Sequence, residues 1–582
     1  MATDPSPQAT NLTESQKLDR VDREFRAALA KLTGGLSPAD YGAAWLDWWL
    51  HLTSSPAKQA ELAQLAMAKA TDVMTFMTKA VTGQAQEAPS SDRRFADPAW
   101  QKFPFNVYAR AFQNGAEFLR QSVTDVDGVS ERSADLMGFV ARNITDAVSP
   151  ANYLPTNPQL LQQTQEEKGA NLARGYQHFV ADLKRTLTGG EYHGTGDFRV
   201  GEKLAVTPGK VVYRNDLMEL IQYSPTTPDV HAEPIVFLPA WIMKYYILDL
   251  SPHNSLYRWL IENGYTVFTI SWKNPTAADR ERGMDDYVRL GVYEPLDVIS
   301  RIMPGRPIHA AGYCIGGTLL MIAAAALAKR GDTRIKDITL FAAQTDFSEP
   351  GELSLFISPS QLAMLEAMMF KEGVLDSTQM GGAFALLRAH DLLWQPAVNA
   401  YVKGQRDKMI DLMAWNADAT RMPWKMHTEY LYGLYLRNDL AHGRFKVEGE
   451  AVNLADIRVP VFAVGTETDH VAPWPSVFKV DRLVSSDEVT LLLTNGGHNA
   501  GIVSGPSHPK RHHRILTRRT GEPSLAPDKW VHAAPRQPGS WWPAWLKWLD
   551  AHSTAERVAP PRMGAPDLPL LGDAPGDYVR QK

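Results

Sequence analysis

A single cysteine is the residue of this chain with the clearest capacity for chemistry. Cys314 is the only cysteine among 582 residues, and it stands in Gly312-Tyr313-Cys314-Ile315-Gly316, between a short apolar run at 308–311 and an Ala-rich stretch. A strand, a sharp turn and a helix in this order form a nucleophile elbow, in which the usual residue is Ser. The glycines permit the close backbone approach that a sharp turn requires. The pattern predicts a nucleophilic thiol; a buried, unreactive cysteine in a Gly-rich turn is the alternative.

An aspartate and a histidine, both later in the sequence, complete a candidate catalytic triad with Cys314. Asp469 follows an apolar run at 459–464, and His498 follows another at 489–493. Because ligands of a parallel sheet bind at the carboxyl ends of its strands, we expect both residues to lie near Cys314. A free thiol has a pKa of about 8.5, so it needs a base to become a thiolate at neutral pH. His498 would accept the proton, and Asp469 would orient the imidazole and stabilise its charged form.

Other residues compete for these roles. Asp346 also follows a predicted strand and is a rival acid, although its place before a long insertion favours a structural role. His470 is a rival base, but adjacent residues rarely face each other, so we expect it to support Asp469 or to contact substrate. The basic run at 510–514, which contains two histidines and follows His508, is interpreted as a solvated loop. It has no Cys or acidic cluster beside it, so no metal site is predicted.

Attack by the thiol on an acyl group creates a negatively charged oxygen, which needs hydrogen-bond donors. The backbone N–H of Ile315, directly after the nucleophile, is the first expected donor. The second donor is expected from the loop that follows the apolar run at 235–238, around Trp241 and Ile242.

A sheet must position these residues, and the chain from about 200 onward predicts one. Short apolar runs alternate with helical stretches, as they do in a doubly wound, mostly parallel sheet. The order nucleophile, acid, base is that of the α/β-hydrolase fold. Buried strands are expected at 235–238, 265–271, 308–311, 338–343, 459–464 and 489–493.

The alternation stops between about 349 and 445. This stretch is rich in Met, Leu and aromatic residues, and it is too long for one connection between a strand and a helix. It predicts an inserted, mostly helical lid over the active-site face, in which methionines allow adaptable packing.

The remaining segments predict a second domain and two less ordered ends. Apolar residues recur three or four positions apart through 14–190, which is typical of an all-helical N-terminal domain. Residues 1–13 are expected to be disordered. The catalytic domain is expected at 200–555 and an extended C-terminal tail at 556–582.

Trp45, Trp48 and Trp49 fall in one predicted helix of the N-terminal domain. A packed helix interface is the expected explanation. Contact with a hydrophobic polymer or a partner protein is the alternative.

Composition and charge narrow the class of protein. The formal net charge of −5 argues against generic nucleic-acid binding. The longest apolar run, at 319–328, is far shorter than the ~18 residues that a membrane span needs. Residues 1–15 do not resemble a secretory leader, and one cysteine excludes an intrachain disulfide and fits a reducing cytosol. We therefore expect a cytoplasmic protein without a membrane span.

Several stretches, taken together, resemble the class I polyhydroxyalkanoate synthases. The segment around Cys314 is similar to the lipase-like box of that family, and the segments around Asp469 and His498 are similar to its acid and base motifs. Further stretches add to the resemblance, which covers roughly 90–550. The matching segments are 244–250, 271–275, 312–317, 415–420, 469–474, 496–501 and 539–543.

This resemblance implies an acyltransferase that polymerises (R)-3-hydroxyacyl-CoA, with 3-hydroxybutyryl-CoA as the expected monomer, and releases CoA. It implies that Cys314 holds the growing polyester as a thioester and that His498 activates Cys314. Asp469 would also help His498 to deprotonate the 3-hydroxyl of the incoming monomer. The resemblance further implies a homodimer at the surface of polyester granules in the cytoplasm, phasins as further partners, and no cofactor or metal.

One position departs from the family pattern. The family has Asn directly before the Lys-Tyr-Tyr stretch, where this chain has Met243. A methionine side chain cannot donate a hydrogen bond to the oxyanion, as an asparagine side chain could. A backbone N–H donor in this loop does not depend on the residue type at 243. Arg388, in the expected lid, is a candidate for binding the phosphates of CoA. A surface charge of the lid is the alternative for Arg388.

Two other functions are compatible with parts of the sequence. A hydrolase with a Cys nucleophile, such as a thioesterase or an enzyme like dienelactone hydrolase, would share the triad but would not need the helical domain or the long insertion. A non-catalytic granule-binding protein of the phasin type would resemble only residues 14–190.

Overall fold

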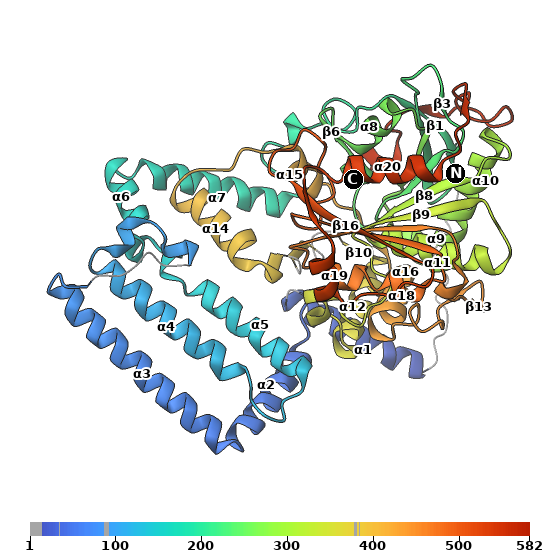
Figure 1. Cartoon of the computed structure of the whole chain (residues 1–582). Coiled ribbons are helices and arrows are strands. Elements are labelled where there is room, and N and C mark those ends of the chain that lie inside the picture. The colour runs from blue at the N-terminus through green and yellow to red at the C-terminus, as the bar shows by residue number, and fades with distance from the viewer. Residues whose placement is uncertain (1–13, 34, 86–91, 377–380, 383–384) are drawn as a thin grey trace, which may run out of the picture. The chain divides into compact units, whose positions relative to one another are not determined.

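The computed structural model describes the chain except for residues 1–13, 34, 86–91, 377–380 and 383–384 (Figure 1). The chain forms two compact units. The first, called the α/β unit, contains Met1–Leu36, Gly196–Gln379 and Ile410–Lys582. The second, called the helical unit, contains Ser37–Thr195 and Met380–Met409.

An 11-stranded sheet is the centre of the α/β unit as far as it is described. Its middle strands are parallel, in the order β15-β14-β9-β8-β4-β7, and antiparallel strands extend it on both sides. The parallel strands are β4 (Ile235–Leu238), β7 (Val267–Trp272), β8 (Ile308–Tyr313), β9 (Ile335–Phe341), β14 (Val461–Thr466) and β15 (Glu488–Thr494). The antiparallel strands are β1 (Gly209–Arg214), β2 (Met218–Tyr223), β16 (His512–Arg519), β17 (Arg536–Pro538) and β19 (Gly572–Asp573).

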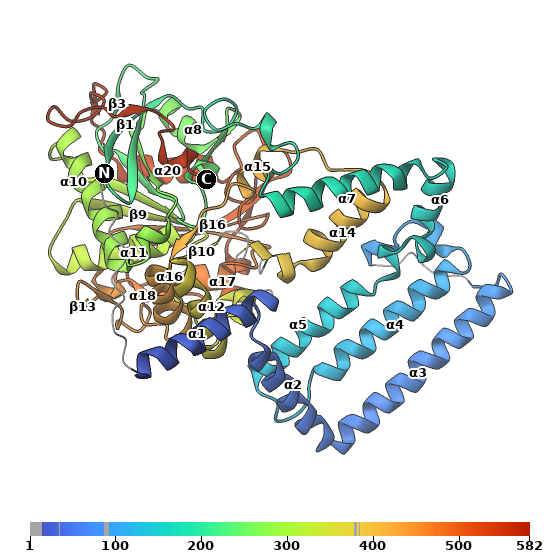
Figure 2. The same cartoon turned by 180° about the vertical axis from the view of Figure 1, so that it is seen from behind.

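The parallel strands form where the sequence has continuous apolar runs, because helices cover both faces of the sheet. Every residue of β4, β7, β8 and β14 is buried. Helix α11 (Ile315–Lys329) and helix α20 (Trp542–His552) lie on opposite sides of β8 and β9 (Figures 1 and 2). From α20, the indole N–H of Trp545 donates to Thr339 Oγ1 at 3.0 Å. Parallel strands between two layers of helices confirm the predicted α/β-hydrolase fold.

The insertion after β9 combines helices with short strands. In the α/β unit it contains α12 (Pro359–Glu372), α15 (Asp411–Asn416) and α16 (Trp424–Tyr430). Strands β10 (Val374–Leu375) and β11 (Met422–Pro423) pair and so join the two arms of the insertion.

The expected domain boundaries remain predictions, and the two compact units divide the chain differently in two places. Helix α1 (Glu14–Leu32) belongs to the α/β unit, where the Arg23 guanidinium lies 4.6 Å from the centre of the Phe370 ring of α12. Residues Met380–Met409, from the middle of the expected lid, belong to the helical unit. Both differences arise from packing between segments far apart in the sequence, which apolar periodicity does not reveal.

The helical unit is built around a small aromatic core. Phe95 and Trp100 are buried and pack edge to face with ring centres 4.8 Å apart. Phe105 and Phe112 pack against them. Its longer helices are α2 (Pro38–Thr53), α3 (Pro56–Val81), α4 (Phe105–Val123), α5 (Glu131–Ala147), α6 (Pro158–Glu166) and α7 (Ala170–Thr188) (Figure 1). No helix in the described part of either unit has the length and apolar character needed to cross a membrane.

The three tryptophans of α2 have different environments. The indole N–H of Trp48 donates to the backbone oxygen of Ser122 at 2.8 Å, so Trp48 packs within the helical unit. Trp45 and Trp49 are 50% and 43% exposed, and their rings stack 5.9 Å apart. The predicted helix interface therefore accounts for Trp48 but not for its two neighbours.

The basic run at 510–514 is expected to be a solvated loop, and this expectation is wrong from His512 onward. Residues from His512 onward form β16, which pairs with β15 and buries His513. The C-terminal segment is largely irregular but is bound to the sheet by β19, which pairs with β1.

A buried carboxylate holds the C-terminal segment. Glu219 of β2 is fully buried, pairs with Arg214, and accepts the backbone N–H groups of Asp577 and Tyr578, each at 3.0 Å. We predict that Glu219→Gln will destabilise the α/β unit by about 2 kcal/mol, because hydrogen bonds to a buried charge are lost. The urea midpoint and the rate of proteolysis of residues 556–582 measure the effect.

Glu262→Gln is the matched control, because the pair of Glu262 with Arg258 on the surface of α8 (Leu256–Glu262) is about half exposed. It should change the stability by less than about 0.5 kcal/mol. Equal effects of the two substitutions would contradict a role for Glu219 in holding the tail.

Candidate active site

Cys314 lies at the turn between β8 and α11. Its backbone has φ 54° and ψ −127°, a conformation that is costly for a residue with a side chain. The Cys314 N–H donates to the backbone oxygen of Phe341 in β9 at 2.8 Å, and the thiol is buried. The strained turn therefore presents the sulfur at the carboxyl end of the parallel strands.

The glycines of the elbow are required by backbone contacts. A Cβ atom on Gly316 would lie 2.2 Å from the backbone oxygen of Leu238 and 2.5 Å from that of Pro239. A Cβ atom on Gly312 would lie 2.4 Å from the Cα atom of Gly317. The N-terminus of α11 can therefore approach the end of β4, from which the segment with Trp241 and Ile242 continues.

His498 and Asp469 are brought together by the loops after β15 and β14. His498 Nδ1 lies 2.7 Å from Asp469 Oδ2. The other carboxylate oxygen, Oδ1, accepts the backbone N–H groups of Val471 and Ala472 at 2.8 and 2.9 Å. These bonds fix the carboxylate and leave Oδ2 to face the imidazole, so that Nε2 is the ring nitrogen available to the thiol.

The local charges favour an ionised Asp469 and a protonated His498. Burial raises the pKa of Asp469, but His498 and the two backbone N–H groups outweigh it, and the pKa is lower than usual. Burial lowers the pKa of His498, yet Asp469 and then Cys314 raise it well above 6.5. The imidazolium is thus stabilised between a carboxylate and a sulfur.

Neighbouring side chains support the loop that contains His498. The Tyr313 hydroxyl donates to Asn499 Oδ1, and the Tyr313 ring lies 5.6 Å from the His498 ring. Arg511, directly before β16, donates to the backbone oxygens of Asn495 at 3.2 Å and Ala500 at 2.6 Å. Burial lowers the pKa of Arg511.

The two expected oxyanion donors are available for a ligand. In the described part of the chain, neither the Ile315 N–H nor the Ile242 N–H donates to a protein acceptor. The Ile315 N–H belongs to the first turn of α11, where backbone donors have no partner within the helix. The arrangement is compatible with an oxyanion site made from backbone donors alone.

Residues of the insertion hold the loop around Ile242. Thr420 Oγ1 donates to the backbone oxygen of Trp241 at 2.6 Å, and Met243 forms a backbone bridge with Ala419. The indole N–H of Trp415 donates to the backbone oxygen of Lys244 at 2.8 Å. The position of Met243 is therefore set by its backbone.

Two tyrosines of the insertion were not predicted as site residues. Burial raises the pKa of Tyr430 and of Tyr435, and Cys314 contributes to both shifts, which places both rings near the thiol. The Tyr430 hydroxyl donates to the Tyr435 hydroxyl at 3.4 Å. In the sequence they are part of an aromatic-rich stretch, and nothing in their spacing separates them from neighbouring core residues.

The rival residues have other partners. Asp346 Oδ1 accepts the N–H and hydroxyl of Ser348 and the side-chain N–H of Asn438, and in the described part of the chain it makes no hydrogen bond to His498. His470 is half-buried, and its backbone oxygen lies against Gly351.

The remaining histidines and Arg388 lie outside the triad. His512 contacts Glu467 at 3.0 Å, and His513 contacts the backbone oxygen of Gly539 at 3.2 Å. His508 contacts the backbone oxygen of Pro509. Arg388 is exposed and belongs to the helical unit, whereas the triad belongs to the α/β unit. Its role in binding phosphates remains a prediction.

This geometry suits acyl transfer through a covalent intermediate. A buried thiol, an imidazole held by a carboxylate, and free backbone donors are the parts that such a reaction needs. Chemistry alone does not specify whether the acyl group passes to water or to an alcohol.

Three models of known families match the sequence. One, described as the N-terminus of poly-beta-hydroxybutyrate polymerase (PhaC), matches residues 91–260, and a second N-terminal model of that polymerase matches 16–58. The third, described as the alpha/beta hydrolase fold, matches 233–504 and so includes the whole candidate triad.

Curated relatives extend the match over most of the chain. A poly(3-hydroxyalkanoate) polymerase of Methylorubrum extorquens is 40% identical, over 90% of this chain and 86% of its own length. The polymerase subunit PhaC of Rhizobium meliloti is 36% identical over 92% and 87%, and that of Cupriavidus necator is 33% identical over 92% and 91%. The chain therefore belongs to the poly(3-hydroxyalkanoate) polymerase family of acyltransferases.

Proposed function

We propose that the protein polymerises (R)-3-hydroxyacyl-CoA, with 3-hydroxybutyryl-CoA as the expected monomer, into polyhydroxyalkanoate and releases CoA. Membership of the family supports the reaction class. The observation that carries the proposal is the position of Cys314, at positive φ on the elbow and interacting with the His498 ring that Asp469 holds.

In the proposed first step, the Cys314 thiolate attacks the carbonyl carbon of the acyl-CoA. The backbone N–H groups of Ile315 and Ile242 bind the oxyanion that forms. The bond between the carbonyl carbon and the CoA sulfur then breaks, and His498 gives its proton to the departing sulfur. The acyl group is left on Cys314 as a thioester, and CoA is released.

In the second step, His498 takes the proton of the 3-hydroxyl group of an incoming monomer. The alkoxide oxygen attacks the thioester on Cys314, an ester bond forms, and the sulfur of Cys314 leaves as a thiolate. The lengthened chain, now carried by CoA, returns to Cys314 by another thioester exchange. Asp469 stabilises the imidazolium that each cycle forms.

Water must be kept from the thioester, because hydrolysis would end the chain. The burial of Cys314 and the nearby rings of Tyr430 and Tyr435 support this requirement. We propose that these rings exclude water while the acyl group is on the sulfur.

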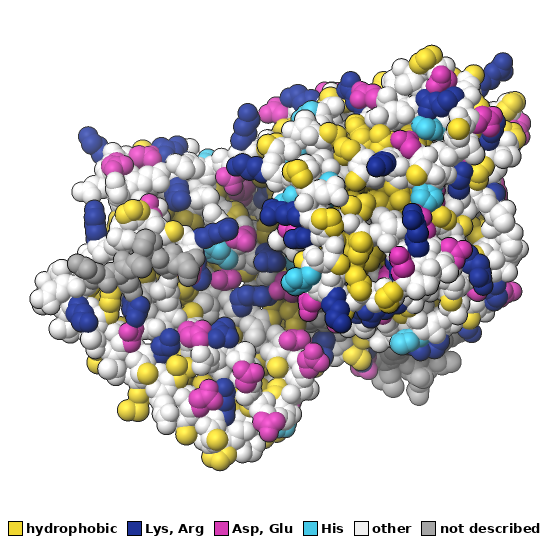
Figure 3. All heavy atoms as spheres, viewed as in Figure 1, with side chains coloured by type: hydrophobic (Ala, Val, Ile, Leu, Met, Phe, Trp, Pro, Cys, Tyr) yellow, Lys and Arg dark blue, Asp and Glu magenta, His cyan; other side chains and the backbone are white. Residues whose placement is uncertain are grey.

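We also propose that the enzyme works at the surface of polyester granules in the cytoplasm. There it would act as a homodimer, with phasins as further partners. Exposed apolar side chains of the helical unit support contact with a hydrophobic surface. On α3 they include Met67, Met74 and Val81, each at least 65% exposed, and Figure 3 shows hydrophobic side chains on the surface over this helix.

Replacement of the thiol tests the reaction. With 3-hydroxybutyryl-CoA, we expect the unaltered chain to release CoA and form polymer, and Cys314→Ala to do neither, because no thioester can form. Free thiol release and the mass of precipitated polyester are the measurements. Free 3-hydroxybutyrate as the main product would support a hydrolase, and polymer from Cys314→Ala would refute the covalent mechanism.

Replacement of the acid tests the assignment of Asp469. We predict that Asp469→Asn will lower kcat by about 10²–10⁴, because the amide no longer stabilises the imidazolium. Asp346→Asn is the matched control, since Asp346 also follows a strand but bonds to Ser348 and Asn438, and it should change kcat by less than about twofold. A larger loss in Asp346→Asn than in Asp469→Asn would reverse the assignment.

The raised pKa of His498 predicts a pH-dependent contribution to stability. The folded chain favours the protonated ring, so the stability that this protonation adds is fully present below about pH 6.5 and is lost as the pH rises through the raised pKa of His498. The side chain of His498→Gln does not titrate, so this variant should lack that part of the pH dependence. The urea midpoint of both proteins between about pH 5 and 9 is the measurement. Parallel pH profiles for the two proteins would contradict the raised pKa.

A further inference from the structure

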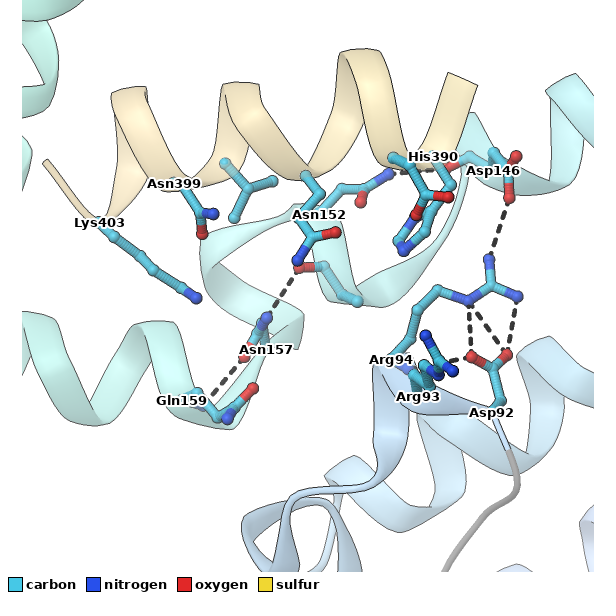
Figure 4. Close-up of a pocket in the computed structure, with 14 residues that line it drawn as sticks. Asp92, Arg93, Arg94, Asp146, Asn152, Asn157, Gln159, His390, Asn399 and Lys403 are labelled. Carbon is cyan, nitrogen blue, oxygen red and sulfur yellow. Dashed lines mark hydrogen bonds and ion pairs between the residues drawn. The ribbon is translucent and has the colours of Figure 1, made fainter. Parts of the chain in front are cut away.

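A polar cavity lies within the helical unit (Figure 4). Its volume is about 540 Å³, within the range of small-molecule sites. One wall is the helical segment 390–403, and the opposite side comes from the turn at Arg93–Phe95 and from the start of α6. Its residues take no part in the proposed polymerisation.

The wall at 390–403 carries a polar stripe. Asp391, Gln395, Asn399 and Lys403 are spaced four residues apart, so they share one face of the segment, and all four line the cavity. The segment contains wide π-type turns at His390–Trp394 and Val398–Val402, which are frequent at functional sites. The stripe is acidic at its beginning and basic at its end.

This wall is held firmly to helices α6 and α7. The Gln163 amide donates to the backbone oxygen of Lys403 at 3.1 Å, and the Asn171 amide donates to that of Val402 at 3.0 Å. Gly175 allows close approach, because a Cβ atom there would lie 2.0 Å from the backbone oxygen of Tyr401. Lys403 therefore extends into the cavity from a fixed backbone (Figure 4).

On the side of the cavity opposite the segment 390–403, some of the charged side chains already form ion pairs with each other. Arg94 binds Asp92 at 2.7 Å and Asp146 at 3.2 Å, which occupies its guanidinium. The Asn152 amide donates to the backbone oxygen of Asp146 at 2.7 Å. These groups form a polar part of the cavity lining that is held by its own hydrogen bonds.

Other groups in the cavity have no partner among the described residues. In the described part of the chain, Arg93, Lys403 and Asp391 each carry a charge without an ion pair, and His390 Nδ1 is buried without a hydrogen bond. Buried polar atoms are nearly always hydrogen-bonded, so an unpaired one that lines a cavity indicates a ligand. Lys403 and Arg93 suit an anion, whereas Asp391 and His390 suit a hydrogen-bond donor.

We propose that this cavity binds a small organic phosphate that has a hydrogen-bond donor at its other end, as a nucleotide does. A phosphate monoester carries nearly two negative charges at pH 7 and so matches the two unpaired cations. Asp391 and Lys403 lie twelve residues apart, at most about 18 Å along a helix. The ligand would span this length or less, with its phosphate at Lys403 and its hydrogen-bond donor at Asp391. The amides of Gln395 and Asn399 would bind the hydroxyl groups between the two ends.

Calorimetric titration of the full chain with AMP, ribose 5-phosphate and adenosine tests the site. We expect AMP to bind most tightly, and Lys403→Ala and Arg93→Ala each to weaken AMP binding about tenfold. Asp391→Asn should weaken the binding of AMP but not that of ribose 5-phosphate. Lys184→Ala, an exposed lysine of α7, is the matched control and should bind AMP like the unaltered chain.

The replaced side chains have no ion pair with any residue that the structure describes. Thermal unfolding without ligand should therefore be unchanged, and loss of binding will not reflect misfolding. Protection of Lys403 from acetylation by AMP, read by mass spectrometry, locates the ligand independently. The proposal fails if AMP does not bind below about 5 mM, if the variants bind AMP normally, or if succinate binds as tightly as AMP.

Discussion

The backbone strain at Cys314 is the constraint on which the active site depends. A residue with a side chain at positive φ costs on the order of 1–3 kcal/mol, so the surrounding structure must hold it there. The hydrogen bond from Cys314 to Phe341 ties the turn to β9, and α11 is buried along most of its length. Gly316 packs against the backbone at the end of β4. The same contacts that offset the strain therefore also bring the start of α11 close to the segment after β4 that contains Ile242, the proposed second oxyanion donor.

A second chain of hydrogen bonds shows why the elbow matters. His309 Nδ1 lies 2.6 Å from Asp337 Oδ2, and His309 Nε2 lies 3.1 Å from Ser553 Oγ, which is a Ser-His-Asp order. However, Ser553 has ordinary extended backbone angles, and its hydroxyl donates to the backbone oxygen of Leu549 at 2.9 Å. This serine fastens the end of α20 to the sheet. A histidine and an aspartate bonded in line therefore do not activate a hydroxyl or thiol that is bound elsewhere. The backbone turn must also leave that group free to react.

The sequence predicted those parts of the fold in which a local pattern of residues has a single physical explanation. Continuous apolar runs located the parallel strands, and glycines around a lone cysteine located the elbow. Strand β16 was missed because its residues are mostly polar and half-exposed, and only pairing with β15 makes it a strand. Tyr430 and Tyr435 were missed because their place beside Cys314 depends on how the insertion folds back. Long-range packing decided each of these cases, including the place of α1.

The insertion combines two roles that a simple lid would separate. Thr420, Trp415 and Ala419 bind the backbone of the loop around Ile242, and the Tyr246 hydroxyl donates to Asp418 at 2.9 Å. A movement that lifted this part of the insertion would also displace the backbone N–H of Ile242, the proposed second oxyanion donor. The proposed mechanism therefore requires that substrate entry leaves residues 415–420 in place. This part of the insertion supports the loop around Ile242, which is a different task from covering the site.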